Sequence, residues 1–301
     1  MEKVFALKTM DRAEAVSSLF SQFDLTDFRG KTVALKANYN SADEFPASTH
    51  LDTLRAIVNE LKNANVADIT LAERSGMGIT REVLSEMGVI KLSEQMGFRA
   101  VVLDELDEKD WIRFEPAPDL HWKRGFLVAK VFKEADRIVQ TCCLKTHRFG
   151  GHLTLSLKNS VGLIAEYDSQ ESYDYMRELH SSPHQRLMIA EANLAYKPDI
   201  IIMDGIEAFV SGGPEDGDRV SPSLMLAGRD RVAMDAVGVA ILRHYGTTRE
   251  VSEGKIFEQQ QIARAAELGI GVRSANEIEL VPLDAASQRS VEEIKEVLAD
   301  G

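Results

Sequence analysis

The chain has 301 residues, of which 44% are hydrophobic and 28% charged, as in an ordinary soluble globular protein. Its formal net charge of −13 gives no general attraction for nucleic acid or anionic membranes, so we expect neither as a partner. The first residues lack the apolar core of a secretory signal, and no apolar run is long enough to span a bilayer, so we expect a cytoplasmic protein. Two adjacent cysteines, Cys142 and Cys143, argue against a disulfide framework and cannot alone hold a four-cysteine iron–sulfur cluster.

Short apolar strands alternate with amphipathic helices along the first third of the chain. The spacing of apolar residues predicts a strand in 31–38, a helix in 50–65, a strand in 67–73, two short helices in 81–97 and a strand in 98–105. A glycine-rich turn, "RSGMG", follows the second of these strands. This β–loop–α–β order favours a parallel or mostly parallel sheet.

The remaining elements follow a less regular order. A Pro-containing loop opens 114–132 and leads into strands or a hairpin; strands are predicted in 135–147, 198–209 and 223–228, and helices in 181–197, 230–246 and 256–271. The predicted fold is α/β, a mixed and mostly parallel sheet flanked by helices. We expect a single domain over 1–301, and the pattern leaves open two lobes, 1–115 and 130–301, with a cleft between them.

Polar side chains stand where several of these strands are expected to end. Asn38 and Glu73 close the first two strands, Lys145 and His147 follow "RIVQTCCL", and Asp204 begins an Asp-Gly turn. In open α/β sheets ligands bind at the carboxyl ends of the strands. A lysine there could hold a carboxylate or phosphate, or act as a base or Schiff-base amine if desolvated, and a histidine could move a proton or bind a metal. Solvated strand ends and an ordinary Asp-Gly turn remain the simpler alternatives.

The segment "HLTLSLKNSVGLI", residues 152–164, combines leucines with several polar side chains. As a strand it places His152 and Lys158 on one face and the leucines on the other; as a helix it aligns His152 with Asn159. Asn159 could cap a helix, and Gly162 would let the backbone approach an anion. An exposed polar strand face and a plain helix cap are the competing interpretations.

Several stretches together resemble a known family. They are "LKANYN", "LKTH" followed by "LTLSLKNSVGLI", "PDIIIMDGIEAFVSGGPEDG" and "DRVAMDAVGVAIL". Over roughly residues 30 to 270 the chain is similar to domain of unknown function 362, an uncharacterised prokaryotic family. The resemblance implies a site rather than a reaction. Some members carry a ferredoxin-like segment with clustered cysteines, which this chain lacks.

Three functions fit these observations. The first is an enzyme acting on a small anionic molecule, a carboxylate or phosphate, with Lys145, His147 and Lys158 as catalytic residues. Its ligand-binding residues would be Asn38, Glu73, His152, Asn159, Gly162 and Asp204. The second is a metal-binding or iron–sulfur-associated redox module, with Cys142, His147 and His152 around a divalent metal. The third is a non-catalytic small-molecule binder. Nickel-pincer racemases also combine lysines and histidines, but that similarity is one of residue type without a shared motif.

Overall fold

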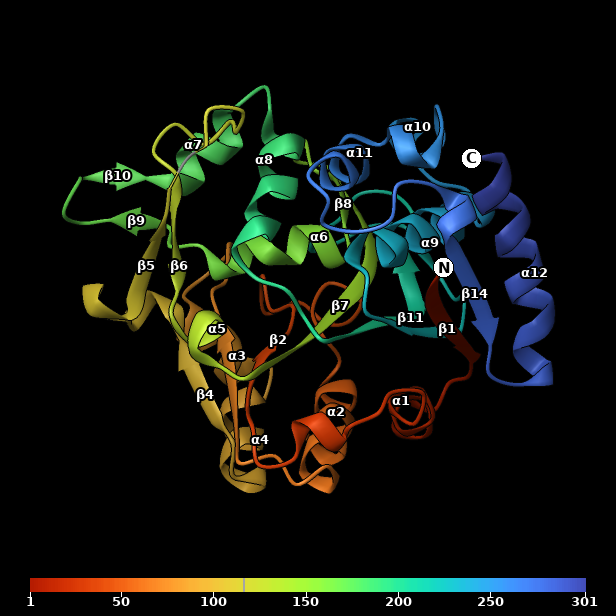
Figure 1. Cartoon of the computed structure of the whole chain (residues 1–301), viewed down its shortest axis with the longest axis horizontal. Helices are drawn as coiled ribbons and strands as arrows, with labels where there is room; N and C mark the ends of the chain where they lie inside the picture. Colours follow the sequence, from red (N-terminus) through yellow and green to blue (C-terminus); the bar gives the residue numbers. More distant parts are fainter. Residues whose placement is uncertain (116) are drawn as a thin grey trace.

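A ten-stranded mixed sheet runs through the protein in a computed structural model that describes residues 1–115 and 117–301 (Figure 1). Its main path has eight strands: β14 (Ile278–Pro282), β1 (Glu2–Lys8), β13 (Leu224–Gly228), β11 (Ile200–Phe209), β7 (Arg137–His147), β2 (Thr32–Lys36), β3 (Asp68–Glu73) and β4 (Arg99–Val102). Two short strands, β8 (His152–Thr154) and β12 (Arg219–Val220), pair with β7 and β11. The strands from β11 to β4 are parallel, whereas β13 is antiparallel to both neighbours. The predicted mixed, mostly parallel sheet is confirmed.

Helices cover both faces of this sheet (Figure 1). They are α1 (Arg12–Phe20), α2 (Leu51–Asn63), α3 (Thr80–Glu86), α4 (Val89–Met96), α5 (Val131–Glu134), α6 (Ser156–Asn159), α7 (Tyr175–Ser181), α8 (Gln185–Ala192), α9 (Arg231–His244), α10 (Arg249–Ser252), α11 (Gln260–Glu267) and α12 (Ala285–Asp300). Helices α1 to α4 bury their apolar residues in one core, while α9, α11 and α12 build a second core on the opposite face. No helix of the described ranges is long and apolar enough to cross a bilayer.

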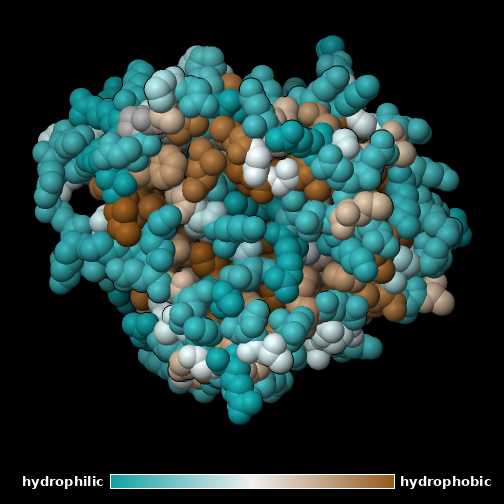
Figure 2. Space-filling view, viewed as in Figure 1, coloured by the Kyte–Doolittle hydropathy of each residue, from teal (hydrophilic) through white to brown (hydrophobic). Residues whose placement is uncertain are grey.

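A third cluster of apolar side chains covers the β2–β3 end of the sheet. It joins α7 and α8 to a separate two-stranded sheet of β5 (Trp111–Phe114) and β6 (Phe126–Ala129). Figure 2 shows hydrophobic residues gathered over this part of the molecule, within a mainly hydrophilic surface. Strands from both expected lobes, 1–115 and 130–301, share the one large sheet. Pro116, in the expected Pro-containing loop, lies outside the described residues.

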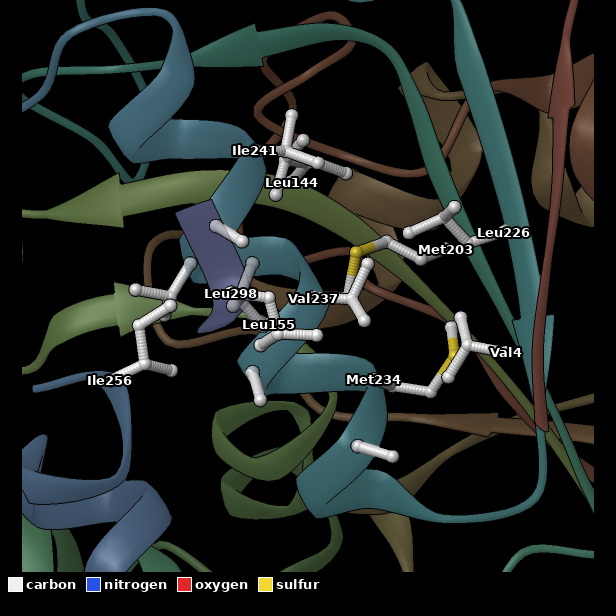
Figure 3. Packing of buried hydrophobic residues seen from close by; sticks show 14 of the residues in the cluster. Val4, Leu144, Leu155, Met203, Leu226, Met234, Val237, Ile241, Ile256 and Leu298 are labelled. Atoms are coloured by element: carbon white, nitrogen blue, oxygen red, sulfur yellow. The ribbon is translucent and has the colours of Figure 1, made fainter. Parts of the chain in front are cut away.

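The central strand β7 sends alternate side chains into the two main cores. Cys142 and Leu144 face the core of α9, and Cys143 faces the core of α1 and α2. Figure 3 shows Leu155 and Met203 beside Val237 of α9, and Leu144 beside Ile241 of the same helix. Both thiols are buried and free, and burial raises the pKa of Cys143 to about 11. The cysteines therefore serve as small core residues.

Lys145 and His147 belong to β7, within the strand predicted over 135–147, and β8 pairs with this last part of the strand. Two other local expectations change in the structure. The Asp-Gly turn expected at Asp204 does not end its strand, because β11 continues through it to Phe209, with an irregular register between Asp204 and Ala208. The segment from His152 is neither all strand nor all helix: β8 ends at Thr154 and α6 begins two residues later.

Candidate functional site

A cavity of about 620 Å³ lies at the carboxyl ends of β2 and β3, beside the β7–β8 hairpin, α6 and α7. This volume suits a small-molecule ligand. The lining side chains include four cations and three carboxylates among amides, histidines and apolar groups. They are Lys36, Asn38, Tyr39, Asn40, Glu73, Arg74, Gly76, Met77, His147, Phe149, Thr154, Lys158, Asn159, Val161, Gly162, Glu166, Asp174, Met176, Arg177, His180 and Pro214.

Lys36 and Glu73 form a buried ion pair in the cavity wall. The Lys36 Nζ donates to both Glu73 carboxylate oxygens, at 2.8 and 2.7 Å, and to the Ala37 carbonyl at 2.6 Å. Burial raises the pKa of Glu73 to about 7, an effect that the charge of Lys36 opposes. A Cβ on Gly162 would stand 2.9 Å from the Lys36 Nζ, so a glycine leaves the room that this lysine occupies. The pair is internally satisfied, and its two charges cancel.

Asn159 ties α6 to the neighbouring strands. Its Oδ1 accepts from the Lys36 Nζ and the Asn38 Nδ2, both at 3.3 Å, and its Nδ2 donates to the Thr141 carbonyl at 3.0 Å. On the other side of Asn38, Lys145 donates to the Asn38 Oδ1 at 2.8 Å and to the Ala47 carbonyl. Lys145 is fully buried behind the wall rather than in the lining. It therefore acts on the cavity through Asn38 and through its charge.

Lys158 stands in the cavity with a free amine. It is partly exposed, and within the described residues it has neither a hydrogen-bond acceptor nor a carboxylate partner for its Nζ. Burial, followed by the positive charges of Lys145 and Arg74, lowers the pKa of Lys158 to about 7. At neutral pH a substantial fraction of this amine is uncharged, and the charged fraction lacks a counter-ion from the described chain.

His147 stands close to Lys158. Its Nδ1 is buried and unpartnered among the residues described. Burial, followed by the charges of Lys158 and Lys145, holds the pKa of His147 far below its ordinary value, so the ring is neutral at pH 7. A second, smaller cavity lined by His152 and Glu250 also reaches His147, which thus separates two hollows. A neutral imidazole here can donate or accept one proton.

Arg74, another basic group of the wall, is held by backbone carbonyls. The Arg74 guanidinium donates to the carbonyls of Ile164 at 2.9 Å, Ser75 at 3.3 Å and Val161 at 3.4 Å. Its nearest carboxylate contact is to Glu166, at 3.6 Å. Arg74 therefore anchors the turn after α6 and still contributes positive charge. Exposed apolar side chains of Met77 and Phe149 stand at the rim.

Helix α6 is short, and its position comes from the core behind it. The two oxygens of Asp235 in α9 accept from the backbone N–H groups of Ser156 at 2.8 Å and Leu157 at 3.1 Å. This carboxylate caps the helix that carries Lys158 and Asn159. Burial raises the pKa of Asp235 to about 8, against the effect of the two backbone hydrogen bonds.

The cavity brings together only some of the residues expected from the sequence. Six of them line it: Asn38, Glu73, His147, Lys158, Asn159 and Gly162. His152 lines the smaller cavity. Asp204 lies elsewhere, where its Oδ2 accepts from the Arg12 Nε at 2.8 Å and the Thr53 Oγ1 at 2.6 Å. Within 1–115 and 117–301, no group of three or more His, Cys, Asp or Glu side chains is arranged to hold a metal, so the expected trio of Cys142, His147 and His152 does not form one.

The charged lining residues that sequence reasoning missed include Lys36, Arg74 and Arg177. Lys36 was counted only as part of an apolar strand, although a lysine at the last position of a buried strand is itself a signal. Arg74 was counted only as the first residue of the glycine-rich turn "RSGMG". Arg177 belongs to α7, a helix that was not predicted, and nothing local in the sequence marks it.

A family model described as "Domain of unknown function (DUF362)" matches residues 33–240. The chain belongs to this family. The resemblance over the lysine–histidine segment is confirmed, and every residue lining the larger cavity falls inside the matched range. A comparison of the DUF362 chain with curated proteins returned no match.

Among solved structures, the DUF362 chain is similar to the lactate racemase apoprotein from Thermoanaerobacterium thermosaccharolyticum. The two share 15% sequence identity with a TM-score of 0.43. The similarity covers 75% of this chain and 54% of that one, so the chain spans about half the length of the racemase structure.

Proposed function

We propose that the larger cavity binds a small molecule bearing a carboxylate or phosphate, and that the protein is an enzyme or ligand-binding protein acting on it. The observation that carries the proposal is the state of Lys158. Lys36 is neutralised by Glu73, and Lys145 and Arg74 are engaged by protein oxygens. Of the three lysines Lys36, Lys145 and Lys158, Lys158 is the one that brings an amine to the cavity without an oxygen partner among the described residues.

The surrounding groups complement an anion. Lys145 and Arg74 add positive potential around Lys158, although the chain as a whole is acidic. A bound anion would favour the charged amine and so raise the pKa of Lys158. The neutral His147 ring, with its buried Nδ1, supplies a proton donor or acceptor beside the same position. These roles fit general acid–base chemistry as well as simple binding, and turnover separates the two.

Thermal-shift titration with inorganic phosphate, acetate and 2-hydroxybutanoate tests the proposal. At least one anion should raise the melting temperature of the wild-type protein in a saturable way, since a ligand that binds only the folded state stabilises it. Lys158→Met should abolish the shift, and Lys295→Met, which removes an exposed lysine on α12, should retain it. Equal shifts in both variants, or no shift with any probe, would count against an anion site at Lys158.

A further inference from the structure

Three lysines meet at this end of the sheet, and only one is free to react. Lys36 is locked against Glu73, with its Nζ 2.7 and 2.8 Å from the two carboxylate oxygens. Lys145 is fully buried and donates to Asn38 and Ala47. Lys158 lines the cavity and has no partner for its amine in the described part of the chain. A nucleophilic lysine needs both an accessible lone pair and a surrounding that favours the neutral amine.

We propose that Lys158 forms a Schiff base with the carbonyl carbon of a 2-oxo acid bound in the larger cavity. This names 2-oxo acids as the ligand class of the anion site, and it rests on the function proposed above. The carboxylate of such a ligand would supply the negative charge that the surroundings of Lys158 lack. Its carbonyl carbon stands next to that carboxylate, within reach of the same amine.

The reaction needs no further reagent. The Nζ lone pair attacks the carbonyl carbon, a C–N bond forms, and the carbonyl oxygen takes up a proton to give a carbinolamine. The amine loses its extra proton, and the C–O bond then breaks as the hydroxyl takes a second proton and leaves as water. The product is an iminium ion whose positive charge replaces that of the protonated lysine. The bound carboxylate offsets this charge, and no oxidant or reductant is consumed.

His147 is placed to handle these protons. Its Nδ1 and the Lys158 Cε each lie 3.0 Å from the point where a Cβ on Gly151 would stand, so the two atoms are at most about 6 Å apart. The glycine leaves this space open on the cavity side. As a neutral ring, His147 can relay a proton from the amine toward the hydroxyl, accepting at one nitrogen while it donates from the other, without becoming a cation beside Lys158.

The rest of the cavity fits the carbon skeleton of an oxo acid. Met77, Phe149, Val161 and Met176 give the lining an apolar part that faces the same space as the amine. A volume of about 620 Å³ exceeds what a three-carbon acid fills, so a longer or aromatic oxo acid would use these side chains. Such a ligand would place its charged end at Lys158 and its apolar end at the rim.

Borohydride trapping tests the proposal directly. The full-length protein is incubated with 2-oxobutanoate or phenylpyruvate, reduced with sodium borohydride and examined by intact mass and peptide mapping. We expect one reduced adduct per chain, mapped to Lys158, with Lys295→Met behaving as wild type and Lys158→Met giving none. Peptide mapping of the wild-type protein keeps the test decisive even if Lys158→Met fails to fold.

Several outcomes would overturn the proposal. They are no adduct with either oxo acid, adducts spread over surface lysines, or an adduct on Lys36 or Lys145. The matched hydroxy acid, 2-hydroxybutanoate, separates this failure from failure of the anion site, because it has the carboxylate but no carbonyl. If 2-hydroxybutanoate shifts the melting temperature in a way that depends on Lys158, but no adduct is trapped, the Schiff-base proposal is refuted and the anion site is supported. If no anion shifts the melting temperature, the proposed anion site itself is refuted.

Discussion

His147 and Lys158 approach each other across a glycine. The Nδ1 of His147 and the Cε of Lys158 both lie 3.0 Å from the position that a Cβ on Gly151 would take. The histidine comes from the end of β7 and the lysine from α6, eleven positions later in the chain. The turn between β7 and β8 thus brings a neutral imidazole and an amine that has no partner among the described residues to one side of the cavity.

Substituting Gly151→Ala should disturb this approach without unfolding the protein. The added methyl would stand tighter against both side chains than ordinary contact allows, so both must move by a few tenths of an ångström. We expect a stability loss of about 1 kcal/mol, in the range of mild overpacking. Anion affinity should fall roughly tenfold, equivalent to about 1.4 kcal/mol. Titration calorimetry with 2-hydroxybutanoate and a parallel denaturant curve measure the two effects.

The lowered pKa of Lys158 makes its contribution to stability depend on pH. The unfolded chain holds a proton on this lysine up to about pH 10.5, whereas the folded protein releases it near 7 because of burial, Lys145 and Arg74. The penalty for the charged amine is therefore complete below pH 7 and disappears as the pH rises toward 10.5. The neutral His147 and His180 rings that face this amine add no compensating negative charge.

Lys158→Met should therefore stabilise the ligand-free protein most at pH 6. Each kcal/mol gained should raise the melting temperature by about 1.5 °C in a chain of 301 residues, because the entropy of unfolding grows with chain length. The gain should shrink between pH 7 and 10 in thermal melts recorded across that range. A gain that stays constant with pH would mean that Met packs better for reasons unrelated to charge, and Lys295→Met reports the background effect of removing an exposed lysine.

The Lys36–Glu73 pair should respond unequally to removal of its two partners. Glu73→Gln leaves a buried cation without an anion and should cost about 3–5 kcal/mol. Lys36→Met leaves a carboxyl whose pKa is already raised to about 7, so it can take up a proton at pH 6 and should cost less, about 1–3 kcal/mol. The double variant should recover much of the loss. Urea denaturation of all four proteins at pH 6 completes the cycle, and equal single losses would contradict this asymmetry.

Asp204 should matter for stability and leave anion binding unchanged. Its carboxylate is buried and accepts from Arg12 and Thr53, away from the cavity lining. Asp204→Asn weakens these hydrogen bonds and should cost about 1–3 kcal/mol. Thermal-shift titration should give the same anion affinity as wild type at a lower starting melting temperature. If Asp204→Asn instead lost anion binding at unchanged stability, Asp204 would have to be part of the binding site.

The sequence predicts the sheet well because its strands and helices repeat with clear periods. The strand of 67–73 and the two short helices of 81–97 appear as β3, α3 and α4, with Gly88 and Gly97 in left-handed conformations beside α4. The site is harder to predict. Long-range contacts decide whether a side chain near the end of a strand lines the cavity or is buried behind its wall. Lys145 and His147 share a strand face by alternation, yet one is sealed against Asn38 and Ala47 while the other lines the cavity.

Asp204 shows the same limitation from another direction. An Asp-Gly pair after an apolar run is an ordinary turn signal, but here β11 continues past it, with Gly205 close to its neighbours. A Cβ on Gly205 would stand 3.0 Å from the Leu224 carbonyl on β13, so the glycine serves strand packing rather than a turn. Lys36 was overlooked because its strand is apolar and was predicted to be buried. A lysine is tolerated there because it pairs with Glu73, a contact that the local sequence does not reveal.

The hydrogen bonds from α6 to Asp235 link the cavity to α9, a helix that contributes no lining residue. Asp235 lies on α9, most of which is buried in the apolar core, and it fixes the backbone of the two residues that precede Lys158. A substitution on the hidden side of α9 would therefore shift Lys158 relative to His147 while leaving every lining residue intact. The position of this amine depends on the packing of the apolar core as well as on the residues around the cavity.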